Sequence, residues 1–166
     1  MLGQAAANLE KAGADFIVIC TNTMHKVVPQ IKQMISIPIL HIAEATAEKL
    51  VENNIHTVGL LGTKYTMTQD FYRDKIEEAG INVVIPSEED VEIVNSVIYN
   101  ELCLGKIKDE SREEYKRIID KMAAEGAEGV ILGCTEIGLL IQQKDSNLPV
   151  FDTTLIHGEK AALFAI

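Results

Sequence analysis

Three short apolar runs constrain the fold more than any other feature of this chain: FIVIC at residues 16–20, VGLLG at 58–62 and GVILG at 129–133. Runs of this kind are typical of strands in a sheet that is covered on both faces. The segments between them read as helices, and strands that alternate with helices are joined by crossovers into a mostly parallel sheet. The sequence therefore predicts an α/β fold.

The pattern of apolar residues and chain breakers places each element along the chain. The expected strands span residues 15–20, 37–40, 56–62, 81–86, 128–133 and 150–152. The expected helices span residues 2–12, 23–34, 42–53, 66–79, 88–104, 110–125 and 135–143, and a last helix begins near Thr154.

Composition narrows the class of function. A chain of 166 residues is long enough for one domain or two small lobes. Its net charge of −10 argues against nucleic acid or an anionic membrane as a partner, because both are bound through clustered Lys and Arg. Three cysteines do not make a secreted disulfide framework. The first residues lack the basic and apolar regions of a signal peptide, and no apolar run approaches the roughly 20 residues of a membrane span, so a cytoplasmic location is expected.

One segment of the chain occurs twice. Residues 13–19 (GADFIVI) resemble residues 126–132 (GAEGVIL), and each copy follows a helix and leads into a small polar loop. Aligning the copies sets Thr21 against Cys134. Any two strand units of a doubly wound sheet look somewhat alike, whereas a true repeat implies two similar lobes that face each other across a cleft. Ligands collect at the carboxyl ends of parallel strands, where these loops lie.

The two loops after the repeated segments carry polar side chains, at residues 21–25 (TNTMH) and 134–137 (CTEI). Each loop stands where a strand leads into a helix, and the free N–H groups and positive dipole end of a helix's first turn attract anions. Asn22 and Thr135 also fit as N-cap residues, which requires no ligand. Together the loops form a candidate anion site.

Three tetrapeptides, NTMH at 22–25, LLGT at 60–63 and GCTE at 133–136, resemble those of the aspartate/glutamate racemase family, and the likeness covers essentially the whole chain. The resemblance implies cofactor-independent racemisation in a cleft between two pseudo-symmetric α/β lobes, with mostly parallel sheets flanked by helices. One cysteine from each lobe would flank the α-carbon of the amino acid. One thiolate would remove the α-proton while the opposite thiol donates a proton to the other face.

The chain departs from the family's pattern in two ways. Members of the family are usually longer by roughly sixty residues at the N-terminus, so residues 1–47 with 150–166 would form an incomplete first lobe and 48–149 the second. The family's first cysteine directly precedes Asn-Thr-X-His, and here that position is Thr21, with Cys20 one residue earlier. The internal repeat makes the same assignment. We therefore expect Thr21 to face the cleft and Cys20 to be buried on the other side, although a one-residue bulge would exchange them.

The residue types in these loops set the expected roles. A thiol can be tuned into a thiolate, whereas an aliphatic hydroxyl is too weak an acid to serve as a standing base. Cys134 is therefore the expected main acid and base, and Thr21 at most donates a proton. Glu136 would orient or deprotonate Cys134, or it is simply an acid in the first turn of a helix. Lys106 would pair with a side-chain carboxylate, as the resemblance implies. The expected set is catalytic Cys134 and Thr21 with substrate-binding Asn22, Thr23, Thr63, Lys106, Thr135 and Glu136.

Several other polar residues have alternative interpretations. His25 would relay a proton, or it packs or caps a helix. Thr63 with Thr66 fits either a bound carboxylate or plain capping. Structural roles are expected for Cys103, His41, His56 and, as a cap, His157.

The sequence contains no metal-ligand spacing, no GxGxxG after a strand and no recognisable Schiff-base lysine, so neither a metal nor another cofactor is expected. The predicted function is racemisation of aspartate or glutamate by a homodimer. A related activity in the same cleft is an alternative, such as that of a hydantoin racemase, a maleate isomerase or an arylmalonate decarboxylase. A degenerate, non-catalytic protein that binds an acidic amino acid is another.

Overall fold

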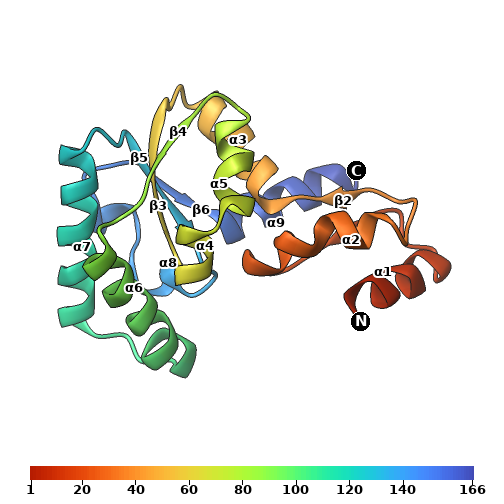
Figure 1. The fold of residues 1–166 in the computed structure, drawn as a ribbon, viewed down its shortest axis with the longest axis horizontal. Coiled ribbons are helices and arrows are strands. Elements are labelled where there is room, and N and C mark those ends of the chain that lie inside the picture. The colour runs from red at the N-terminus through yellow and green to blue at the C-terminus, as the bar shows by residue number, and fades with distance from the viewer.

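A computed structural model describes residues 1–166. It contains two sheets in which every strand pairing is parallel. The larger sheet has the strand order β4-β3-β5-β6, and the smaller one pairs β1 with β2 (Figure 1). The strands are β1 (Ile17–Val18), β2 (Ile39–Leu40), β3 (Thr57–Gly62), β4 (Asn82–Val84), β5 (Gly129–Gly133) and β6 (Val150–Asp152).

Helices connect and cover these strands. The α-helices are α1 (Leu2–Lys11), α2 (Val28–Lys32), α3 (Ile42–Glu52), α4 (Lys64–Thr68), α5 (Asp70–Glu77), α6 (Glu88–Asn100), α7 (Asp109–Ala124), α8 (Ile137–Leu140) and α9 (Thr153–Phe164). The 3₁₀ helices are η1 (Thr23–Val27), η2 (Leu102–Leu104) and η3 (Gln143–Asp145). None of the helices combines the length and the apolar character that crossing a bilayer requires.

The larger sheet is buried on both faces. Alternate residues of β3 point to opposite sides: Leu60 packs in a core of twelve buried residues beneath α3 and α5, and Leu61 packs in a core of eighteen beneath α6, α7 and α8 (Figure 1). Ile131 and Leu132 of β5 divide between the same two cores. This double burial explains why VGLLG and GVILG are apolar at every position, because neither face of the strand meets water.

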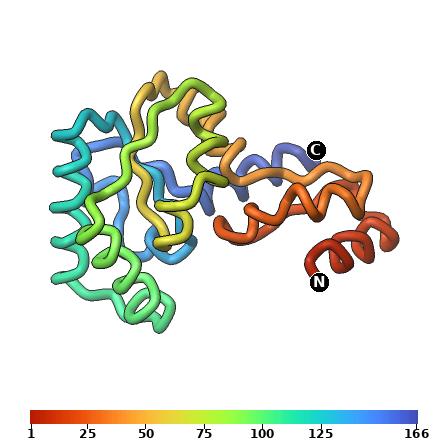
Figure 2. The backbone as a smooth tube through the Cα atoms, in the orientation of Figure 1, coloured from red at the N-terminus to blue at the C-terminus, as the bar shows by residue number.

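The smaller sheet belongs to a much smaller packing unit. A cluster of five buried residues from α1, α2, β1 and β2 forms its core: Ala6, Ile17, Val28, Ile31 and Ile39. Figure 2 follows the backbone from this unit through the larger sheet and back along α9, so that the two ends of the chain lie at the same side of the molecule. Helix α9 packs against α3 and thereby connects the two units.

The α/β fold with parallel sheets flanked by helices is confirmed, but several predicted boundaries are wrong. The expected helix at 23–34 is divided into η1 and α2, and Pro29 stands in the first turn of α2. The expected helix at 66–79 is interrupted at Gln69, whose backbone is extended. The expected helix at 135–143 is reduced to α8, because Ile141 is extended. The expected strands at 15–20 and 37–40 shorten to two residues each.

The strand pairing places part of the predicted first lobe in the larger sheet. Residues 150–152, which we assigned to the first lobe, form β6 and pair with β5 in the larger sheet. Only the rest of that segment, α9, extends toward the smaller unit. The division into residues 1–47 plus 150–166 and 48–149 as two lobes stays a prediction.

Candidate active site

Two neighbouring strands, β3 and β5, end at the same edge of the larger sheet and bring two predicted site residues side by side. Gly62 and Gly133 are Cα partners at the ends of β3 and β5, so Thr63 and Cys134 leave adjacent strands side by side. A Cβ on Gly133 would lie 2.9 Å from the backbone oxygen of Leu61, so only glycine allows this close approach. The carboxyl ends of parallel strands are where ligands bind in sheets of this type.

The second predicted loop forms a compact hydrogen-bonded group. The Cys134 thiol donates to Oε2 of Glu136 at 3.0 Å, and the Thr135 hydroxyl donates to the same oxygen at 2.8 Å. Cys134 is 9% exposed, at the boundary of the larger core. Thr135 does not cap α8, since Glu136 is the N-cap residue and no side chain caps this helix.

Burial and Glu136 together set the protonation of Cys134. Burial raises the pKa of the thiol to about 12, and the hydrogen bond and negative charge of Glu136 act in the same direction. For Glu136 itself burial opposes the charged form, but the hydrogen bonds from Cys134 and Thr135 outweigh burial and lower its pKa. At neutral pH the pair is therefore a neutral thiol that donates to a carboxylate, which is the arrangement of a nucleophile or acid with its base in contact.

Three threonine hydroxyls join the first predicted loop to the end of β3. Oγ1 of Thr23 lies 3.5 Å from Oγ1 of Thr63 and 3.3 Å from Oγ1 of Thr66, and the last two lie 3.1 Å apart. Thr63 also caps α4 by accepting from the backbone N–H of Thr66. The capping interpretation is thus confirmed for Thr63, and the same hydroxyl belongs to a polar group shared by both units.

Asn22 has a different position from the one its N-cap interpretation predicts. It is 4% exposed, and its side chain makes no capping bond to η1. Its Nδ2 instead donates to Oγ1 of Thr153 at 3.1 Å, while its Oδ1 has no hydrogen-bond partner within the chain. The exposed Thr21 satisfies a backbone N–H at the start of η1 instead, because its Oγ1 accepts from the N–H of Met24 at 3.3 Å.

The expectation that Cys20 is buried is wrong, since both Cys20 and Thr21 are exposed. The argument from strand alternation fails because β1 ends at Val18 and neither residue lies in a strand. The assignment of Thr21 to the cleft therefore depends on the family resemblance and the internal repeat, and it stays a prediction.

The buried histidines have structural contacts. Nδ1 of His25 lies 2.7 Å from the carbonyl oxygen of Thr21, and its Nε2 accepts from the N–H of Ile42 at 3.1 Å. Both ring nitrogens are occupied and burial lowers the pKa of His25, so the packing interpretation holds and the proton relay does not. His41 caps α3. The expectation that His157 is a cap is wrong, because it lies within α9, and its Nε2 bonds to the carbonyl oxygen of Leu40. No group of three or more His, Cys, Asp or Glu side chains is arranged to hold a metal ion.

Lys106 and Cys103 lie on the segment between α6 and α7. Lys106 is exposed, its backbone N–H donates to Glu101, and its side chain makes no hydrogen bond to the Cys134 group. Cys103 is exposed rather than structural, on η2, which packs against α8. Partial desolvation raises the pKa of Cys103, and the charge of Glu136 adds to this effect. Because η2 packs against α8, it borders the site.

Sequence analysis overlooked Thr153, which is fully buried. It is the first residue of α9, directly after Asp152, whose carboxylate caps that helix. The paired Thr153-Thr154 after an acidic residue was a visible helix-start signal, but the sequence does not reveal that the first of them faces β5.

Comparison with known proteins places the whole chain among racemase-like sequences. The family model described as Asp/Glu/hydantoin racemase matches residues 1–161. The broad specificity amino-acid racemase RacX of Bacillus subtilis (strain 168) is 28% identical over 153 residues, which are 90% of this chain and 64% of RacX. The chain therefore spans less than two thirds of that relative's length.

Two solved structures are similar over 99% of this chain and 72% of their own. The crystal structure of a putative Asp/Glu racemase from Yersinia pestis is 52% identical, with a TM-score of 0.94. That of an aspartate racemase homologue from Pyrococcus horikoshii OT3 is 42% identical, with a TM-score of 0.90.

Proposed function

The chain belongs to the Asp/Glu/hydantoin racemase family, and from this premise we propose that it racemises aspartate, glutamate or both without a cofactor. In this reaction Cys134 would exchange a proton with the α-carbon, and Thr21 would act on the opposite face. The observation that carries it is the thiol of Cys134 in contact with the Glu136 carboxylate at 3.0 Å, at the carboxyl end of β5.

The contact with Glu136 supports a sequence of proton movements. Glu136 takes the proton of the Cys134 thiol, and the thiolate removes the α-proton of the amino acid. In the free chain burial and Glu136 hold the pKa of the thiol at about 12. The α-ammonium of the bound amino acid would favour the thiolate, because a nearby cation lowers the pKa of a thiol. The donor on the other face is Thr21, directly or through water, so catalysis should be unequal in the two directions.

Hydroxyl and amide groups around this pair support binding of the substrate. Thr23 and Thr63 present hydroxyls that would donate to the α-carboxylate, and Thr135 presents another beside Cys134. Asn22 contributes a buried amide. Lys106, which is exposed on the segment between η2 and α7, would pair with the side-chain carboxylate.

Deuterium exchange tests the proposal. The chain is incubated with each enantiomer of aspartate and glutamate in deuterated water, and loss of the α-proton signal is followed by NMR. Wild-type chain should exchange at least one of the four substrates, and Cys134→Ala should abolish the exchange. Cys103→Ala is the matched control, because it removes an exposed thiol beside the site and should leave exchange intact. Exchange that persists in Cys134→Ala would contradict the assignment of Cys134 as the group that removes the α-proton.

The threonine at position 21 favours a second candidate, a non-catalytic protein that binds an acidic amino acid. A racemase of the proposed type needs a proton donor on each face, and a hydroxyl is a much weaker acid than a thiol. Saturable binding of aspartate or glutamate without any exchange would select this candidate. Exchange of the ring α-proton of hydantoins, or isomerisation of maleate to fumarate, without exchange of any amino acid would instead select another chemistry of the same family.

A further inference from the structure

Thr153 connects the two halves of the candidate site. Its Oγ1 lies 2.8 Å from the carbonyl oxygen of Leu132, two residues before Cys134, and 3.1 Å from Nδ2 of Asn22. Its side chain is completely buried, so no water competes for these bonds. The hydroxyl therefore links the loop after β1 to the strand that carries Cys134.

The chemistry of the hydroxyl decides the direction of both bonds. A backbone carbonyl can only accept, so the single hydroxyl hydrogen of Thr153 is donated to Leu132. Toward Asn22 the oxygen can then only accept. The carboxamide must present its NH₂ group to Thr153, which leaves Oδ1 as a buried acceptor without a partner in the chain.

We propose that Thr153 is a positioning residue that fixes the carboxamide of Asn22 so that Oδ1 accepts from the α-ammonium of the substrate. The ammonium ligand rests on the proposed function, whereas the orientation of the Asn22 amide follows from the hydrogen bonds alone. At neutral pH an acidic amino acid has only one group that donates hydrogen bonds, its ammonium, because both carboxylates only accept. A buried unpaired acceptor selects that group and disfavours a carboxylate at the same position.

A measurement without ligand tests the orientation. In ¹⁵N-asparagine-labelled chain, the side-chain NH₂ resonances of Asn22 are identified by their absence in Asn22→Ala. One of the two protons should be protected from solvent exchange in wild-type chain and in Thr153→Ser, which keeps the hydroxyl. The protection should be lost in Thr153→Val and Thr153→Ala, with near-wild-type thermal unfolding showing that at least one of them is folded. Protection that persists in a folded variant without the hydroxyl overturns the proposal.

A pair of ligands tests the ammonium assignment. Calorimetric titrations compare L-aspartate with succinate, which has both carboxylates but no ammonium. Thr153→Val should bind aspartate about tenfold more weakly than wild-type chain and succinate about equally, whereas Thr153→Ser should restore binding of aspartate. Adding Thr153→Val to Asn22→Ala should weaken aspartate binding no further, because the two residues act through one bond.

The possible failures are distinguishable. If wild-type chain neither binds nor exchanges any acidic amino acid, the proposed function fails and the ammonium assignment fails with it, while the amide measurement still decides the role of Thr153. If wild-type chain is active but Thr153→Val weakens aspartate and succinate equally, the ammonium assignment is overturned and the racemase proposal stands.

Discussion

The hydrogen bond between Cys134 and Glu136 couples the protonation of the two side chains. The carboxylate raises the pKa of the thiol, and it is also the only base in contact with that thiol. Removing its charge should therefore ease ionisation of the thiol while slowing proton transfer from it. A variant at Glu136 should therefore make Cys134 more acidic and the enzyme slower at the same time.

We predict both effects for Glu136→Gln. The pKa of Cys134 should fall below its value of about 12, yet stay above that of an exposed thiol because burial remains. The α-proton exchange rate at pH 7 should fall by at least about a hundredfold, since a general base contributes that much or more. Thiolate absorbance followed against pH in a Cys20→Ser, Cys103→Ser background measures the first effect. An unchanged exchange rate would show that another base acts on Cys134.

Thr21→Cys should raise the rate of exchange for the enantiomer that wild-type chain processes more slowly. The reason is that a thiol donates a proton far more readily than a hydroxyl. Cys20→Ser is the matched control and should leave both rates unchanged. If Thr21→Cys has no effect and Cys20→Ser lowers the rate, Cys20 faces the cleft and the alignment of the internal repeat is one residue in error.

Residues close together in sequence were the predictable part of the site. The contact between Cys134 and Glu136 follows from their spacing, and the cap at Thr63 follows from its place between a strand and a helix. The bond between Asn22 and Thr153 joins residues 131 positions apart and depends on how α9 begins beside β5. No local pattern contains that information, so the sequence offered for Asn22 only substrate binding or a local cap.

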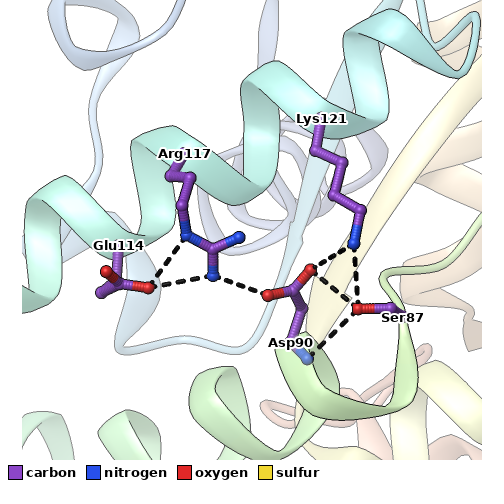
Figure 3. Close-up of polar contacts among 5 residues, drawn as sticks. All are labelled: Ser87, Asp90, Glu114, Arg117 and Lys121. Atoms are coloured by element: carbon purple, nitrogen blue, oxygen red, sulfur yellow. Dashed lines mark hydrogen bonds and ion pairs between the residues drawn. The ribbon is translucent and has the colours of Figure 1, made fainter.

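At the scale of elements, a buried carboxylate holds α6 against α7. Asp90, in the first turn of α6, has a side chain that is 4% exposed and is bonded to Arg117 at 2.6 Å and to Lys121 at 3.0 Å, both on α7. Ser87, the N-cap of α6, donates its hydroxyl to the same carboxylate, and Glu114 supports Arg117 from the side (Figure 3). The hydrogen bond from Arg117 is the largest cause of the lowered pKa of Asp90, about 2.

We predict that Asp90→Asn destabilises the chain by about 2 kcal/mol at pH 7, from a folded pKa of about 2 against an ordinary value of 3.8. Because the folded pKa is the lower one, this stabilisation is complete above about pH 4 and is lost as the pH falls toward 2. Urea unfolding at pH 7 and pH 3 measures it, and the difference between wild type and variant should shrink at the lower pH. Asp120→Asn, at an exposed position of α7, is the control and should have little effect at either pH. An Asp90→Asn penalty independent of pH would mean that packing, not charge, connects the helices.

The accuracy of the element predictions followed the strength of their burial. The apolar runs that became β3 and β5 were placed correctly, because burial on both faces requires an almost continuous apolar run. The region 23–34 was not, because a 3₁₀ segment before Pro29 and a short helix after it give the same residue pattern as one continuous helix. Its division depends on contacts such as that of Thr23 with Thr63, which local propensity does not encode.

At the scale of the whole molecule, the two packing units are unequal. The cores on the two faces of the larger sheet contain eighteen and twelve buried residues, and the core around β1 and β2 contains five. β1 is hydrogen-bonded along one edge only, to β2. Helix α9 starts beside the larger sheet and reaches the smaller unit at its other end, where Phe164 packs against Phe16. It exposes large apolar side chains at both ends: Leu155 is 71% exposed and Leu163 is 65% exposed. A small core, an open strand edge and an apolar surface along α9 favour association through α9.

We therefore predict that the chain forms a homodimer through the surface that includes α9. Sedimentation velocity should show the dimer for wild-type chain and the monomer for Leu155→Glu with Leu163→Glu, because two charges on that surface oppose its burial. Val51→Glu with Tyr99→Glu is the matched control: both residues are exposed and apolar, they lie on α3 and α6, and the same charge is added. The control should remain dimeric. A dimer that survives the α9 changes but dissociates with the control would place the interface on the larger unit and leave the apolar surface of α9 without this role.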